Sequence, residues 1–177
     1  IGALDGRAEL LDALAPFLTG GSMITRVELQ DADYMPAPIK FEAGTQRVSQ
    51  AVAFAEAVRY LQHLGMDNVH AWEQELGARL VAGVQNIEGV RLLGPTDPNK
   101  RAGLVSLGID GVHPHDAGQL LDTKGIAVRV GHHCAQPLHR GAGLTASTRA
   151  SAYLYNTTED IDAFLAALAE VRPYFGL

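Results

Sequence analysis

Cysteine is almost absent from this sequence, which contains only Cys134 among its 177 residues. A single cysteine excludes an internal disulfide framework and is typical of proteins in a reducing compartment, so we expect a cytoplasmic protein. Charged residues are also scarce, at 19% of the chain, which is fewer than in a typical domain. Such a deficit suits a chain that buries part of its surface against a partner.

Long apolar runs and basic runs are missing as well. No apolar stretch approaches the roughly 20 residues that a membrane-spanning helix requires. The formal net charge is −6, so the basic patch expected of a nucleic-acid-binding domain is absent. The sequence therefore predicts neither a membrane partner nor a nucleic acid partner. The first methionine is Met23 and no signal-peptide pattern opens the chain, so we expect an upstream piece to be missing.

Apolar periodicity predicts mainly helices at first and then alternating strands and helices. Helices are expected over 7–15, from Val48 to about Gly65, and from a cap at Asp67 onward. Strands are expected over 90–93, 104–109 and 126–130, with helices over about 115–125 and after an approximate capping box at Thr157 and Asp160. This order predicts a compact α/β domain over 67–177. Residues 1–66 would belong to something larger, and the aperiodic stretch 20–46 is expected to be poorly ordered or to pair with another copy.

Residues 129–137, which read RVGHHCAQP, are the most informative run for chemistry. Cys134 comes just after an apolar strand, where a side chain is firmly held and still accessible. Neighbouring histidines and arginines favour the thiolate, which is the nucleophilic form of cysteine. Two other interpretations remain at this point. A lone cysteine is more often an inert buried thiol, and a metal site at His132 to Cys134 would lack a second Cys/His cluster to complete it.

Two further runs contain residues that can bind anionic groups. Arg149 is expected beside a helix start, where its guanidinium could hold a carboxylate through two hydrogen bonds, although a solvated arginine is the simpler interpretation. Gly44 and Thr45 precede the first long helix and could bind phosphate, or Thr45 could merely cap the helix. Residues 138–143 are expected to form a flexible loop that could swing Cys134 between two partners.

In this order the runs resemble the C-terminal portion of a SufS-type (group II) cysteine desulfurase, a pyridoxal phosphate (PLP) enzyme of the SUF iron–sulfur cluster system. The matching stretches are 20–24, 41–45, 125–137, 148–151 and 155–157. The short loop between Cys134 and Arg149 favours group II over group I. The resemblance implies the α/β fold of a fold-type I PLP-dependent transferase. Residues 1–66 would be the tail of the large domain with an interdomain helix, and residues 67–177 the C-terminal small domain.

The resemblance also implies a role for each matching residue. Cys134 would be the nucleophile that attacks the sulfur of L-cysteine, giving L-alanine and a persulfide, with Arg149 on the substrate carboxylate and Arg129 in support. Thr45 would contact the cofactor phosphate of the other subunit in a homodimer. The persulfide sulfur would pass to an acceptor protein. A SufU-type acceptor is favoured over a SufE-type one, because family members with a histidine at the place of His115 take a zinc ligand from SufU.

One departure from the family pattern concerns lysine. Family members form a Schiff base with PLP through a lysine in a Ser-Gly-His-Lys stretch, whereas this chain has only Lys40, Lys100 and Lys124, none in that context. The sequence therefore predicts that the 177-residue chain alone neither holds PLP covalently nor turns over cysteine, and it predicts no metal site of the chain's own. A selenocysteine lyase or other fold-type I lyase, a stand-alone thiol-bearing sulfur carrier, and a different Cys/His enzyme are the alternative interpretations.

Overall fold

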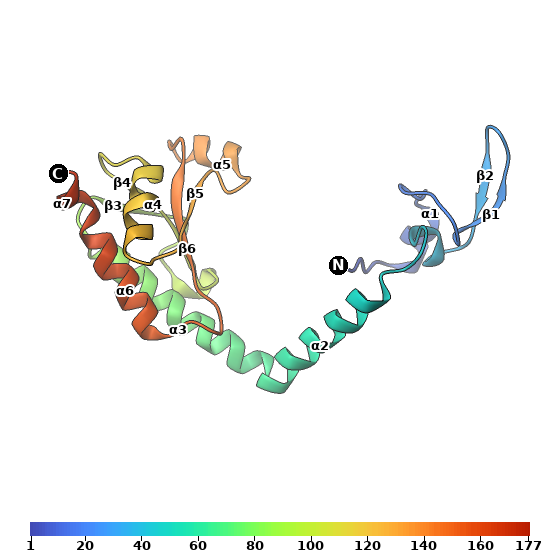
Figure 1. Ribbon diagram of the computed structural model, residues 1–177, viewed down its shortest axis with the longest axis horizontal. Coiled ribbons are helices and arrows are strands. Elements are labelled where there is room, and N and C mark those ends of the chain that lie inside the picture. The colour runs from blue at the N-terminus through green and yellow to red at the C-terminus, as the bar shows by residue number, and fades with distance from the viewer. The chain divides into compact units, whose positions relative to one another are not determined.

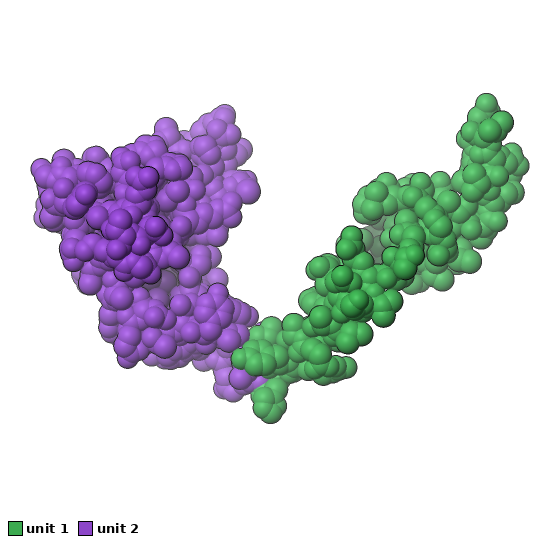
Figure 2. Space-filling view, viewed as in Figure 1, with its two compact units in different colours: residues 1–63 green, residues 64–177 purple.

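The computed structural model describes residues 1–177 as two compact units, Ile1–His63 and Leu64–Leu177 (Figures 1 and 2). The first unit consists of short elements followed by one long helix. In chain order these are α1 (Ala8–Ala13), β1 (Ile24–Val27), β2 (Ala32–Tyr34), the 3-10 helix η1 (Ile39–Phe41) and α2 (Val48–Leu64). The strands β1 and β2 form an antiparallel pair.

Residues 20–46, where poor order was expected, contain this hairpin and two buried anchors. The Met23 side chain is fully buried. Lys40 is also buried, and its ammonium group donates a hydrogen bond of 2.7 Å to the main-chain oxygen of Asp12. Helix α2 contains no buried residue and exposes apolar side chains such as Val52 and Phe54. Exposed apolar surface of this kind is typical of a surface that packs against another part of a protein.

The second unit is a four-stranded antiparallel sheet packed against helices. Its elements are α3 (Met66–Gln85), β3 (Val90–Leu93), the 3-10 helix η2 (Pro98–Lys100), β4 (Leu104–Ile109), α4 (Pro114–Thr123), β5 (Arg129–Gly131), α5 (Gln136–Gly141), β6 (Ser147–Ser151), α6 (Thr158–Ala169) and α7 (Val171–Tyr174). The strand order is β3-β4-β6-β5. The strands predicted over 90–93 and 104–109 are confirmed with those bounds.

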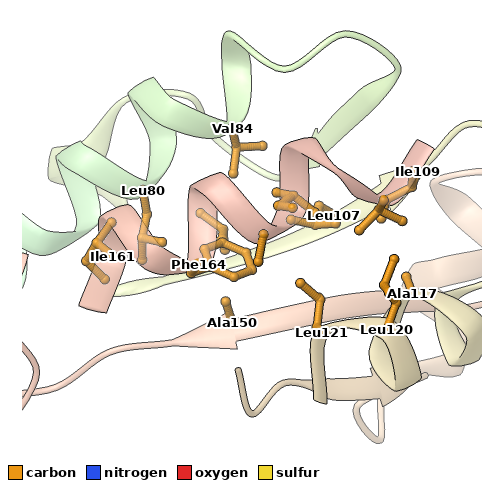
Figure 3. Close-up of a cluster of buried hydrophobic side chains, with 14 of the residues drawn as sticks. Leu80, Val84, Leu107, Ile109, Ala117, Leu120, Leu121, Ala150, Ile161 and Phe164 are labelled. Carbon is orange, nitrogen blue, oxygen red and sulfur yellow. The ribbon is translucent and has the colours of Figure 1, made fainter. Parts of the chain in front are cut away.

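The hydrophobic core lies between the sheet and the helices α3, α4 and α6 (Figure 3). Strand β4 contributes Val105, Leu107 and Ile109 to this core. Because side chains alternate between the two faces of a strand, the intervening residues of β4 and β6 lie on the opposite face. We call this the open face of the sheet; in β6 it carries Ser147 and Arg149, whereas Ala150 lies in the core.

Two helix starts differ from the sequence prediction. Helix α3 begins at Met66 after Gly65, whose φ of 85° ends α2, and Asp67 lies in the first turn rather than at the cap. Helix α4 begins at Pro114, and its cap is His113, whose ring accepts a hydrogen bond from the main-chain N–H of His115. Proline at the first helical position needs no amide partner, which explains the earlier start.

The capping box of α6 is confirmed. The Thr157 hydroxyl accepts from the main-chain N–H of Asp160, and the Asp160 carboxylate accepts from the main-chain N–H of Thr157. The two bonds satisfy helix N–H groups that would otherwise lack partners. No helix of the structure combines the length and apolar character needed to span a membrane.

Candidate active site

Arg129 and Arg149 are direct neighbours in the β5–β6 ladder. The antiparallel register pairs these two residues across the strands, and Arg149 is also paired with Ser106 of β4. Directly opposed residues share one face of a sheet, so both arginine side chains project from the open face. The buried Nε of Arg149 has no hydrogen-bond partner. An unpaired buried donor beside a second cation indicates a place that an anionic group would fill.

The position of Arg149 corrects the prediction of a helix start. Arg149 lies in the middle of β6, and the helix expected near it begins only at Thr158. The sequence of β6, STRAS, has no apolar alternation that would have marked it as a strand. The position is nevertheless suited to a clamp, because β6 is an inner strand and the backbone of Arg149 is paired with a strand on each side.

Cys134 lies in a tight turn that directly follows β5. We call residues 132–135 the Cys134 loop; it is closed by a hydrogen bond of 2.8 Å from the Ala135 N–H to the His132 oxygen. His133 and Cys134 have φ values of 52° and 63°, in a left-handed region that residues other than glycine rarely adopt. Such strain persists where the surrounding structure requires it, and it clusters at functional sites. The thiol is exposed, so Cys134 is not the inert buried cysteine considered above.

The Arg129 guanidinium contacts the sulfur of Cys134. Its Nη2 donates a hydrogen bond to Sγ over 3.6 Å. A cationic donor stabilises a thiolate more than a neutral thiol. The structure therefore places Arg129 in contact with Cys134 and pairs Arg129 with Arg149 across the two strands, so that the thiol and the two cations belong to one region of the β5–β6 pair.

Two residues that the sequence did not single out complete this part of the molecule. Ser147 of β6 is fully buried, and its hydroxyl lies 2.9 Å from Nε2 of His133 and 2.9 Å from Nε2 of His139. His139 lies in α5, where a flexible loop over 138–143 was expected; Pro137 in the first turn starts this helix. The shared strand face of Ser147 and Arg149 was the signal that could have indicated Ser147.

His133 has a lowered pKa. Burial is the main cause, and the positive charges of Arg149, His139 and Arg129 act in the same direction, while the Ser147 main chain opposes them. Both effects disfavour the imidazolium form. The neutral form of the His133 ring is therefore favoured beside Cys134 in the sequence.

The remaining predicted residues lie outside this group. Thr45 is exposed and precedes α2 in the first unit, and the helix begins three residues later, at Val48. His115 is exposed in the first turn of α4, and its ring stacks on that of His113 at 5.4 Å between centroids. The ring contact of His115 is thus with His113 and not with the Cys134 loop, and Thr45 belongs to the other unit.

The lysines of the chain do not fit a Schiff base with PLP. The Lys40 ammonium is bound to the Asp12 oxygen, and Lys124 forms an ion pair of 2.6 Å with Glu170. Lys100 is exposed in η2, 4.0 Å from Asp97. None of the three lies in the Cys134 loop or in the strands beside it. The chain supplies a thiol and an arginine pair.

A surface pocket of about 370 Å³ lies elsewhere in the second unit. It is lined mainly by β6, α6 and the segment between them, including Ala150, Tyr155, Asn156 and Phe164. Cys134, Arg129 and Arg149 are not among its lining residues. The exposed Cys134 thiol therefore lies outside this pocket.

A comparison with protein-family models matches residues 1–164 to the aminotransferase class-V family. The chain belongs to this family. Among curated relatives, the probable cysteine desulfurase 2 of Mycobacterium leprae (strain TN) is 51% identical over 99% of this chain. The probable cysteine desulfurase of Streptomyces coelicolor is 48% identical over the same share. The chain spans 42% of the length of each of these relatives.

Solved structures identify the same fold. The cysteine desulfurase of Thermococcus onnurineus NA1 matches with a TM-score of 0.87 and 36% identity, over 97% of this chain and 42% of that one. The cysteine desulfurase CsdA of Escherichia coli matches with a TM-score of 0.86 and 32% identity, over 96% and 41%. The α/β fold of this aminotransferase class-V chain is thus that of part of a fold-type I PLP-dependent enzyme, the small domain with the tail of the large one.

Proposed function

We propose that the chain is the sulfur-accepting part of a SufS-type cysteine desulfurase, which removes sulfur from L-cysteine for iron–sulfur cluster assembly. The observation that carries this proposal is the placement of an exposed Cys134 thiol beside the paired Arg129 and Arg149. The relatives named cysteine desulfurase support the same activity.

The proposed reaction converts the Cys134 thiol and L-cysteine into a Cys134 persulfide and L-alanine. The thiolate attacks the substrate sulfur, so an S–S bond forms while the C–S bond breaks. The electron pair of that bond stays with the substrate carbon, which takes a proton and becomes the methyl group of alanine. In the complete enzyme PLP supplies the electron sink for this chemistry. Arg149 binds the substrate carboxylate, because a planar guanidinium with a free buried donor matches two carboxylate oxygens.

The organisation of the complete enzyme follows from the same proposal. Residues 1–66 form the tail of the PLP-binding large domain and the interdomain helix, and residues 67–177 form the small domain that carries the nucleophile. The enzyme is a cytoplasmic homodimer in which Thr45 contacts the PLP phosphate of the other subunit. A threonine hydroxyl and main-chain N–H groups before a helix are suitable phosphate ligands.

Two measurements test the activity. The complete enzyme, supplied with PLP and L-cysteine, should release alanine and carry a persulfide on Cys134 that mass spectrometry detects as one added sulfur atom. Cys134→Ser should abolish the persulfide. Alanine released from selenocysteine but not from cysteine would contradict the proposal and indicate a selenocysteine lyase.

The 177-residue chain alone should show no turnover, because none of its lysines fits a Schiff base. Incubation of the purified chain with PLP and L-cysteine should give no alanine above the background of free PLP. Alanine above that background would contradict this part of the proposal and leave the activity itself standing.

We further propose a zinc-containing SufU-type protein as the sulfur acceptor, with a SufE-type protein as the alternative. The support is the exposed imidazole of His115 at the start of α4, because a neutral imidazole is a common zinc ligand. His115→Ala in the complete enzyme should abolish the stimulation by SufU, and the stacked neighbour His113 offers the control His113→Ala. Undiminished SufU stimulation of His115→Ala would exclude this role.

A further inference from the structure

A chain of hydrogen bonds runs from α5 across the open face to the Cys134 loop. It begins at the carbonyl oxygen of Ala135, which lies 3.0 Å from Nδ1 of His139. A carbonyl oxygen can only accept a hydrogen bond. Nδ1 of His139 therefore carries the proton, and in the neutral ring Nε2 is left as an acceptor.

The Ser147 hydroxyl links His139 to His133, so the tautomer of His139 determines that of His133. It has one proton to donate, and its partner at 2.9 Å is the unprotonated Nε2 of His139. Its oxygen must then accept from Nε2 of His133, also at 2.9 Å. A neutral imidazole that donates through Nε2 has a lone pair on Nδ1. Nδ1 of His133 is buried and has no partner in the chain.

We propose that His139 and Ser147 are positioning residues that hold His133 as the neutral Nε2–H tautomer, with Nδ1 as the free proton acceptor of the site. The inference rests on the proposed desulfurase activity, in which Cys134 must lose its proton before it attacks. In the free chain Nδ1 of His133 has no partner, Cys134 included, so the transfer requires Nδ1 to come within hydrogen-bond distance of Sγ in the substrate complex. There the S–H bond of Cys134 breaks, an N–H bond forms at Nδ1 of the preceding residue, and His133 becomes an imidazolium. Ser147 and His139 thereby determine which nitrogen of the His133 ring carries the proton.

The charges around His133 agree with this assignment. It faces Arg149 of β6, His139 of α5 and Arg129 of β5. Burial is the main cause of its lowered pKa, and the charges of the two arginines act in the same direction even when His139 is neutral. These effects favour the neutral ring, which is the form that a base requires. The same two arginines are directed to anionic groups, the thiolate and a carboxylate, whose arrival offsets their effect on the imidazolium.

Nitrogen-15 spectra of the histidine-labelled 177-residue chain test the tautomers without any need for turnover. Long-range proton–nitrogen correlations at about pH 8, where histidine is ordinarily neutral, should show His133 protonated on Nε2 and His139 on Nδ1. Ser147→Ala should convert His133 to a mixture of tautomers. Thr148→Val removes the neighbouring buried hydroxyl of the same strand and should change neither ring. A proton on Nδ1 of His133, or an unchanged His133 in a folded Ser147→Ala chain, would overturn the proposal.

Kinetics of the complete enzyme supply the second readout. Loss of a general base typically lowers a rate by 10²-fold or more, so His133→Asn should lower kcat by about that factor. Ser147→Ala should lower kcat less and shift the acidic limb of its pH profile, with the KM for L-cysteine unchanged because Arg149 is intact. If Ser147→Ala does not fold, His139→Gln removes the Nδ1–H donor instead, and normal kcat in this variant would contradict the proposal. An inactive wild-type enzyme with the expected tautomers would refute the activity alone.

Discussion

Arg129 and Arg149 occupy directly opposed positions of the β5–β6 ladder, and the Arg129 guanidinium also donates to the sulfur of Cys134. Like charges directly opposite each other destabilise a sheet. The pair therefore destabilises the free chain, and bound anionic groups offset this repulsion. A thiolate and a substrate carboxylate are the two anions that the proposed reaction brings to this place.

Replacement of Arg149 by lysine should weaken substrate binding in the complete enzyme. Lysine keeps the positive charge but has no planar pair of donors for a carboxylate. A lost hydrogen bond to a charged group costs about 1.5–3 kcal/mol, so the KM for L-cysteine should rise roughly 10- to 100-fold. Steady-state kinetics measure this change. Arg91→Lys in the edge strand β3 is the control, and an unaltered KM for Arg149→Lys would rule out the carboxylate role.

Replacement of Arg129 by glutamine should slow the alkylation of Cys134. Its guanidinium donates to Sγ, and a charged donor favours the reactive thiolate. The chain has one cysteine, so mass spectrometry after reaction with iodoacetamide follows this thiol alone. Arg140→Gln, an exposed arginine of α5, should alkylate at the rate of the unmodified chain. Equal rates for the Arg129 variant would show that this contact does not activate the thiol.

The stability of the chain should depend on His133 in the acidic range. The pKa of His133 is lowered in the folded chain from its ordinary value of 6.5, so the unfolded chain binds its proton first as the pH falls. The contribution of neutral His133 to the free energy of unfolding is complete above pH 6.5. It decreases as the pH falls from there toward the pKa of the folded chain. Asparagine tolerates a positive φ and does not titrate, so His133→Asn should flatten this part of the profile. Urea unfolding at several pH values measures it, with the exposed His70→Gln as control; a profile unchanged in His133→Asn would contradict the assignment.

Loss of the α6 cap should destabilise the small domain. Thr157→Ala removes the acceptor for the Asp160 N–H and should lower the free energy of unfolding by about 1 kcal/mol. Thr158→Ala is a matched control, because the Thr158 hydroxyl bonds only to the neighbouring Glu159 carboxylate. Equal unfolding free energies for the two variants would show that the cap contributes little.

The sequence predicted those elements whose residues alternate or repeat in an apolar pattern. The strands over 90–93 and 104–109 and the capping box at Thr157 are confirmed. Strand β5 covers only Arg129–Gly131, shorter than the expected 126–130. Strand β6 was missed, and Arg149 was assigned to a helix start. The sequence of β6, STRAS, lacks the apolar alternation that marks a strand, because only Ala150 contributes to the hydrophobic core.

The candidate site was predictable in its residues and not in its geometry. The run around Cys134 and the arginines indicated a nucleophile with cationic neighbours. Their register across β5 and β6 depends on sheet order, which joins strands that are separated in sequence by α5. The hydrogen bond between Ser147 and His139 likewise depends on α5. The sequence predicted a flexible loop there because of Gly141 and Gly143.

The left-handed backbone at His133 and Cys134 determines which replacements preserve the site. A residue in this conformation is strained by about 1–3 kcal/mol unless it is glycine or a tolerant type such as asparagine. The positive φ values thus limit which residues the loop accepts, independently of side-chain chemistry. A β-branched residue such as valine or threonine in place of His133 would disfavour this conformation and displace the Cys134 thiol from Arg129, however similar its size. Variants of the Cys134 loop should therefore be chosen by torsion preference before polarity.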